Sequence, residues 1–187
     1  MDDKKSEVLV DTPFDETHAQ ISPDSKWIAY TSDLTGRKEV YVQPFPAGTG
    51  RWQVSPDARP DTKTYGGDWP RWRKDSKELF YHALGGVETG AYGDTSTIRG
   101  PIYSVTVTAI GGSLETSTPR EVIRMIALRI PHPGGDYHTY EVSADGQKFL
   151  VPQRVVDNAG PTATQVLPDH PSPGLMVAIN WMQRLKK

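Results

Sequence analysis

Residues Ile21–Tyr30 read ISPDSKWIAY, and this stretch decides the fold because variants of it return twice along the chain. Residues 72–81 read WRKDSKELFY, and residues 142–151 read VSADGQKFLV. Each copy starts with a large apolar residue, reaches an Asp followed by Ser or Gly, and ends in an apolar run. The spacing is 51 and then 70 residues, measured between Asp24, Asp75 and Asp145. Blade-type β repeats run about 40–50 residues, so the sequence predicts such repeats, lengthened by insertions at Gly85–Gly100 and Pro131–Tyr137.

The centre of each copy is predicted to be a tight β-hairpin turn. Pro23 presets φ for the second turn position, Asp24 suits the third, and the next residue needs a positive φ. Glycine adopts that conformation freely at position 146, whereas serine at positions 25 and 76 is expected to carry left-handed strain. We therefore interpret four residues as structural turn residues and not as paired catalytic carboxylates: Asp24, Asp75, Asp145 and Gly146.

Further strand-forming runs follow each hairpin. After the first come residues 39–43 and 51–54, and after the second come residues 101–107 and 120–123. Four strands per repeat is the pattern of a propeller blade. The third copy offers only residues 140–142, 149–151 and 175–181, and residues 7–10, ahead of the first hairpin, form an unmatched predicted strand.

These runs predict an all-β fold in which residues 1–187 form a single partial propeller of about three four-stranded blades. Blade one covers about 17–55, blade two about 66–124 and blade three about 138–182, with the strand at 7–10 completing a blade. Three blades are half of a six-bladed ring and cannot close alone. The sequence leaves two explanations open: missing N-terminal blades upstream of Met1, or a homodimer that closes the ring.

Composition excludes several classes of function. With 21 basic and 23 acidic residues the net charge is -2, which argues against nonspecific nucleic-acid binding. The chain has no cysteine, so disulfides, thiolate metal sites and cysteine nucleophiles are excluded. No apolar run reaches the roughly 18 residues of a membrane helix, and residues 1–6 lack the apolar core of a signal peptide.

Candidate binding residues lie in the two insertions, because long loops on rigid scaffolds often carry function. The sequence offers as a possible binding loop Tyr92, Asp94, Arg99, His132, Asp136 and His138. The His residues match no standard zinc spacing, so we predict neither a metal nor another cofactor. An inert insertion remains the alternative.

Two other stretches are interpreted as structural. His18 precedes the first predicted strand and is taken as a surface histidine. The run Trp69–Lys74 interleaves aromatic and basic residues as single-strand binders do. Trp72 aligns with Ile21 and Val142, however, which predicts that all three are core positions of the inner strands, with Arg71 and Arg73 on the opposite face.

The repeats resemble the TolB-like, WD-repeat-like β-propellers of bacteria, whose signature is Ser-Pro-Asp-Gly before Lys or Arg and an apolar strand. Residues 22–26 (SPDSK) and 143–147 (SADGQ) match that signature with one and two departures. Residues 27–32 (WIAYTS), 70–73 (PRWR) and 78–81 (ELFY) are similar to stretches in the C-terminal propellers of bacterial transmembrane Ser/Thr protein kinases.

The resemblance implies a non-catalytic binding, sensing or protein-interaction module, usually on the extracytoplasmic, periplasmic side of the membrane. No kinase motif is present, nor the Gly-x-Ser-x-Gly elbow of a hydrolase, so no catalytic residue is assigned. The alternative is the propeller part of a hydrolase, either prolyl oligopeptidase-like or with its site in the channel. The sequence does not name the protein or small-molecule ligand.

Overall fold

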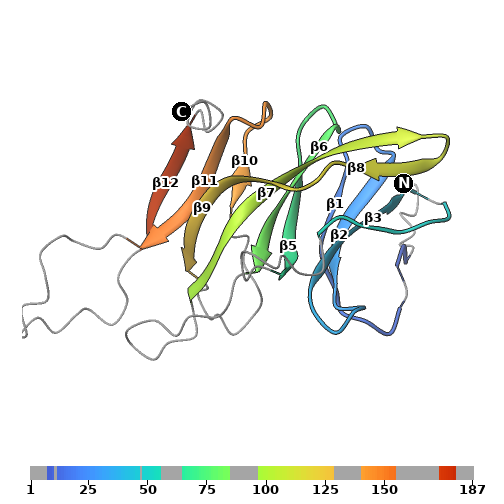
Figure 1. The fold of residues 1–187 in the computed structure, drawn as a ribbon, viewed down its shortest axis with the longest axis horizontal. Helices are drawn as coiled ribbons and strands as arrows, with labels where there is room; N and C mark the ends of the chain where they lie inside the picture. The colour runs from blue at the N-terminus through green and yellow to red at the C-terminus, as the bar shows by residue number, and fades with distance from the viewer. Residues whose placement is uncertain are drawn as a thin grey trace, which may run out of the picture.

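The structure is a computed structural model that describes residues 8–10, 12–46, 48–55, 65–84, 97–128, 140–154 and 173–179. The described residues form twelve β-strands and no helix, and every strand pairing is antiparallel. The strands make three sheets that stand side by side in chain order (Figure 1).

The first sheet contains four strands in sequence order. They are β1 (Glu16–Ile21), β2 (Trp27–Ser32), β3 (Glu39–Pro44) and β4 (Trp52–Gln53). All six residues of β2 are buried, which fits its apolar and hydroxyl-bearing sequence WIAYTS in the middle of a sheet. The register of β1 on β2 shifts between Thr17 and Gln20, so a β-bulge interrupts the innermost strand.

The second sheet has five strand segments: β5 (Tyr65–Trp72), β6 (Glu78–Leu84), β7 (Thr97–Ile110), β8 (Ser113–Thr116) and β9 (Arg120–Leu128). Residues 107–110 of β7 pair with β8, and residues 97–104 pair with β9. β8 and β9 therefore both run antiparallel to β7, one after the other. They are separated by a break at residues 117–119, where Pro119 lacks the backbone N–H that a strand pairing would use. The sheet is four strands wide, as predicted, but β8 was not predicted.

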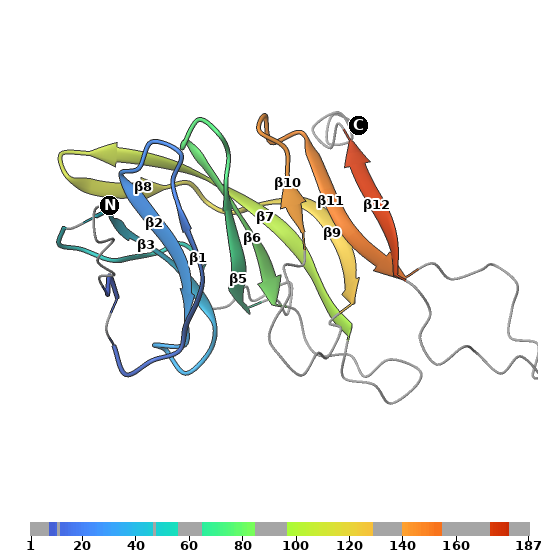
Figure 2. The ribbon, with the colours of Figure 1, turned by 180° about the vertical axis from the view of Figure 1, so that it is seen from behind.

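The third sheet contains β10 (Glu141–Val142), β11 (Lys148–Arg154) and β12 (Pro173–Ile179), in that order. In the described part of the chain β12 has a strand neighbour only at β11. It lies at one end of the row of sheets, and the first sheet lies at the other (Figures 1 and 2).

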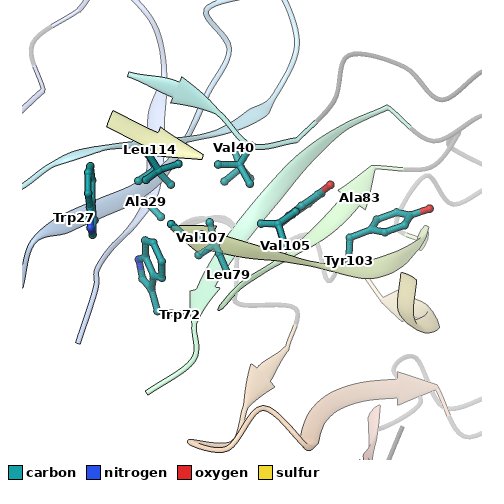
Figure 3. Close-up of a cluster of buried hydrophobic side chains, with 13 residues drawn as sticks. Trp27, Ala29, Val40, Trp72, Leu79, Ala83, Tyr103, Val105, Val107 and Leu114 are labelled. Carbon is teal, nitrogen blue, oxygen red and sulfur yellow. The ribbon is translucent and has the colours of Figure 1, made fainter. Parts of the chain in front are cut away.

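Two apolar clusters fill the spaces between the sheets. The larger cluster joins the first and second sheets and includes Trp27, Ala29, Val40, Trp72, Leu79, Val107 and Leu114 (Figure 3). Val107 and Leu114 reach it because the β7–β8 hairpin extends across the first sheet (Figure 1). The smaller cluster joins the second and third sheets and is built on Trp69, Phe80, Ile102, Val122, Tyr140, Phe149 and Val151.

The three predicted hairpin turns are present. Ser25 has φ 58°, Ser76 has φ 59° and Gly146 has φ 73°, so the left-handed backbone expected after each Asp is observed. The turns also touch one another: the Asp24 N–H donates to Ser76 Oγ at 3.0 Å, and the Lys74 N–H donates to the Ala144 carbonyl at 3.2 Å. Each turn is thus hydrogen-bonded to the turn of the next sheet.

Three predictions need correction. Residues 8–10 form no strand, and Val8 and Leu9 are exposed, because they pair with none of the described strand edges. Ile21 is 45% exposed and is not a core residue, since no sheet precedes the first among the described residues. His18 lies inside β1 with a nearly buried side chain and is not on the surface.

The fold is all-β, and the open row of antiparallel sheets is that of a partial propeller. The aromatic residues of the Trp69–Lys74 run, Trp69 and Trp72, are buried, which confirms the structural interpretation of that run. The blade boundaries themselves remain a prediction.

Candidate functional site

The predicted binding-loop residues lie largely outside the described chain. Nothing is described for Tyr92, Asp94, His132, Asp136 or His138. Arg99 is described at the backbone only. It lies in strand β7, where it pairs with Ile126 of β9, and not in a loop. Its role in binding therefore remains a prediction, and the described residues direct attention to three other places: two inter-sheet junctions and a groove.

The junction between the first and second sheets centres on the buried carboxylate of Asp68 on β5. Its Oδ1 accepts hydrogen bonds from His18 Nδ1 at 2.8 Å and Thr31 Oγ1 at 2.8 Å. Its Oδ2 accepts from Lys38 Nζ at 3.2 Å. All three donors come from the first sheet or its loop, so one carboxylate binds the two sheets together.

These contacts set the ionisation of Asp68. Burial alone would raise the pKa of its carboxyl, but the hydrogen bond from His18, the charge of Lys38 and the Thr31 hydroxyl together hold the pKa below its usual value of 3.8. Asp68 is therefore ionised at neutral pH. Because a carboxylate only accepts, His18 Nδ1 carries the proton in this hydrogen bond.

The backbone is strained where this junction is built. His18 has φ 55° and Trp69 has φ 51°, and these two positions are equivalent when the repeats are aligned on Asp24 and Asp75. Bulky residues rarely adopt a positive φ. Both residues sit at register shifts of the innermost strands, and their rings lie 5.2 Å apart between centroids. The bulges thus turn both rings into the junction.

Close backbone approach completes the same junction. The Gly67 N–H donates to the Lys38 carbonyl at 3.1 Å. A Cβ added at Gly67 would lie 2.8 Å from the Tyr81 ring and 2.9 Å from Ser55 Cβ. Only glycine therefore lets β5 start so close to the first sheet.

The junction between the second and third sheets is mainly aromatic. Phe80 and Phe149 pack edge to face at 5.3 Å between centroids, and the Tyr140 hydroxyl donates to the Trp69 carbonyl at 2.9 Å. Burial raises the pKa of that hydroxyl, which therefore remains a donor. The Arg71 guanidinium lies 6.0 Å from the Tyr140 ring centroid and 3.4 Å from the Glu141 carboxylate.

His82 is the one fully buried histidine in the described part of the chain. Its Nε2 lies 3.2 Å from the Gly100 carbonyl, and its ring packs against the Trp69 ring at 5.8 Å between centroids, with the ring planes tilted by 32°. Burial lowers the His82 pKa to about 4, against the smaller opposing effects of the Gly100 bond and the Asp68 charge. His82 is therefore neutral at physiological pH.

A groove of about 410 Å³ opens at the rim between the first two hairpin turns. Its walls are Asp24, Lys26 and Trp27 from the first turn, Asp75, Ser76 and Lys77 from the second, and Thr106–Ala109 from β7. Both signs of charge line it. Two of the turn residues predicted from the sequence, Asp24 and Asp75, thus meet here, although nothing in the sequence indicated that β7 would extend beside them.

One edge of β7 is open in this groove. The pairing of β6 with β7 ends at Glu78 and Thr106, after which the Val107 N–H donates to the Lys77 carbonyl at 2.9 Å. The β7–β8 hairpin closes with Ile110 opposite Ser113, so Thr108 and Ile110 bond toward β8. The N–H and C=O of Ala109 therefore point to the other edge, where no described strand pairs with them.

The residues that the structure describes contain no group of three or more His, Asp or Glu side chains placed to hold a metal ion. They also contain no helix of the length and apolarity that a membrane crossing requires.

The chain matches no protein-family model and no curated protein. Among solved structures it is similar to the crystal structure of TolB from Acinetobacter baumannii, with 15% sequence identity and a TM-score of 0.41. The alignment covers 95% of this chain and 44% of the TolB chain. This chain therefore spans less than half the length of that protein.

Proposed function

We propose that this chain is a non-catalytic protein-interaction module that binds an extended segment of a partner protein in the rim groove. The open edge of β7 beside that groove carries the proposal. An exposed sheet edge binds an extended peptide through main-chain hydrogen bonds, with adjoining pockets selecting side chains. The free groups at Ala109 lie among the groove walls, Lys26, Ser76 and Lys77.

The geometry limits what can bind. The open edge is short, because Val107 already donates its N–H to the Lys77 carbonyl and Thr108 bonds toward β8, which leaves the N–H and C=O of Ala109 for an extended chain. Trp27 and the β7 backbone supply apolar wall, whereas Lys26, Lys77, Asp24 and Asp75 place charges of both signs at the turns. A short extended segment with a small apolar centre and charged flanks fits these walls.

The test first selects peptide ligands and then removes the backbone N–H of Ala109. Random nonapeptides displayed on phage are selected against the full chain, and enriched peptides are measured by fluorescence anisotropy. Ala109→Pro removes the N–H that points into the groove but leaves the β8 ladder intact. We expect the selected peptides to bind this variant about tenfold more weakly.

Ala109→Ser is the matched control, because it changes the same side chain and keeps the N–H. It should bind the peptides as the wild type does. Far-UV circular dichroism and the melting temperature of both variants verify that they fold. The proposal fails if no peptide is enriched, or if enriched peptides bind Ala109→Pro as tightly as the unsubstituted chain.

The sensing role and the periplasmic location implied by the family resemblance belong to the same proposal. They are supported by the repeat stretches at 22–26 and 143–147. Fractionation of native cells into cytoplasm, periplasm and membranes, with an antibody against the chain, tests the location. Recovery in the cytoplasm alone would contradict it.

A further inference from the structure

We infer that the partner segment bound in the rim groove is acidic, with Asp or Glu side chains close to the small residue that pairs with Ala109. This inference rests on the proposed function and names the chemistry of the partner. It is carried by two lysines, Lys26 and Lys77, which are equivalent positions in the repeats and line the groove from its two turns.

The ammonium groups of both lysines are available to a ligand. Lys26 and Lys77 are exposed. Each closes its own turn with the backbone N–H only, which donates to the Asp two residues earlier, at 3.2 Å to Asp24 and 3.1 Å to Asp75. Among the described residues neither Nζ donates a hydrogen bond. A bound carboxylate therefore meets two donors without displacing an existing contact.

The two carboxylates of the groove are already occupied by their own turns. The Ser22 hydroxyl donates to Asp24 at 2.6 Å, in addition to the backbone N–H described above. The Arg73 guanidinium donates to both oxygens of Asp75, at 2.9 Å and 2.8 Å. These acids therefore serve the turns, whereas the ammonium groups remain for a partner.

The charges around the second turn balance without Lys77. Arg73 forms an ion pair with Asp75 at 2.8 Å and another with Glu78, and Arg120 lies 3.6 Å from the other Glu78 oxygen. Two guanidinium groups thus neutralise two carboxylates, and Lys77 adds a further positive charge. Because the first turn contributes one acid and one lysine, the surroundings of the groove carry excess positive charge, although the whole chain has a net charge of -2.

The third turn shows that the hairpin itself does not require a lysine at this position. Gln147 is the residue equivalent to Lys26 and Lys77. Its backbone N–H still donates to the Asp145 carboxylate, at 3.0 Å, but its side chain brings no charge. The turn geometry therefore accounts for the backbone bond and not for the two lysine side chains that meet at the groove.

An extended acidic segment satisfies this arrangement. Residues two apart in a strand lie on the same face, so a chain paired at Ala109 directs alternate side chains toward the groove walls. Lysine is a point charge on a flexible stem with three donors, and it does not demand one fixed carboxylate geometry. The two lysines therefore select acidic composition near the central residue and not one exact sequence.

Peptides selected on the rim groove test the inference through their composition and salt dependence. We expect the enriched nonapeptides to carry Asp or Glu within two residues of a small residue. Because exposed charges are screened by salt, their affinity should fall severalfold between about 50 and about 500 mM sodium chloride. These two readouts use the unsubstituted chain, so they do not depend on the folding of any variant.

Substitution of the lysines gives an independent result. Lys26→Gln and Lys77→Gln should each weaken an acidic peptide about threefold, and the double variant about tenfold. Lys74→Gln is the matched control, because Lys74 is an exposed lysine of the second turn that does not line the groove, and it should bind as the wild type does. Circular dichroism and the melting temperature verify that the variants fold.

The outcomes separate this inference from the proposed function. Neutral or basic peptides that lose affinity with Ala109→Pro would overturn the acidic partner and leave the proposed function standing. The same holds if acidic peptides bind the double lysine variant as tightly as the wild type. Absence of any enriched peptide overturns both. A single-stranded oligonucleotide that displaces the peptides and depends on the same two lysines would assign the groove to nucleic acid instead.

Discussion

The two junctions between the sheets use different chemistry for the same task. At the first, the Asp68 carboxylate binds three polar side chains of the neighbouring sheet, and Gly67 lets the backbones touch. At the second, Phe80 and Phe149 meet through their rings. Hydrogen bonds depend on direction and charge, whereas ring packing depends on volume.

The difference implies that the junctions fail for different reasons. Removing charge should loosen the first junction and leave the second intact. Removing volume should loosen the second regardless of pH. Substitutions at each junction, read against pH, therefore separate the two contributions to one fold.

The largest effect is expected at the aromatic junction. Phe80→Ala removes a fully buried ring and leaves a cavity beside Phe149, which should lower the free energy of unfolding by about 3–5 kcal/mol. Urea denaturation at pH 7 and at pH 5 measures it, and the loss should be the same at both. Phe14→Ala, at an exposed phenylalanine, is the control and should change stability by less than about 0.5 kcal/mol. A comparable loss in both variants would contradict the assignment of Phe80 to a tight junction.

Asp68→Asn should cost about 3 kcal/mol at pH 7, because His18 and Lys38 lose the buried charge they surround. The Asp68 pKa is lowered in the folded chain, so its contribution is complete above pH 3.8 and is lost as the pH falls through the folded pKa. The deficit of the variant should therefore be constant from pH 7 to 5 and shrink below about pH 4. Glu115→Gln, on the exposed strand β8, controls for removing a negative charge. A deficit that persists unchanged at pH 3 would show that Asp68 acts through shape and not through charge.

The sequence predicted the parts of this molecule that repeat. The turn Asp residues and the positive φ at Ser25 and Ser76 follow from local chemistry that is visible in one repeat, and the burial of Trp72 follows from aligning the repeats.

What the sequence could not predict depends on the neighbouring sheet. Ile21 has the apolar character of a core residue, but burial requires a preceding sheet that the described chain does not contain. His18 becomes buried because a bulge turns it toward Asp68, which lies 50 residues away in sequence. Aligning the two repeats makes His18 equivalent to Trp69, but it does not indicate Asp68 as the partner of His18.

A smaller effect should appear at His82 between pH 6.5 and 4. Its pKa is lowered from 6.5 to about 4 by burial, so between these pH values the unfolded chain binds a proton at His82 and the folded chain does not. The contribution of neutral His82 to stability is fully present above pH 6.5, and the free energy of unfolding should fall by about 2 kcal/mol on going to pH 5. His82→Gln keeps an N–H for the Gly100 carbonyl and does not titrate, so urea titrations at pH 7 and 5 should show a flatter profile than the wild type. Equal slopes in both proteins would assign this pH dependence elsewhere.

The smallest effects compare the first two turns. Ser25→Gly removes left-handed strain and should raise the free energy of unfolding by a few tenths to about 1 kcal/mol. Ser76→Gly removes the same strain but also the hydroxyl that accepts the Asp24 N–H, worth about 0.5–1.5 kcal/mol. Its net effect should therefore be near zero or destabilising, and the two variants should differ in melting temperature although they change the same residue type at equivalent positions. Clear destabilisation by Ser25→Gly would refute the turn assignment. An equal gain in both would show that the hydrogen bond between the turns contributes nothing, and that the sheets are held at their faces and not at the rim.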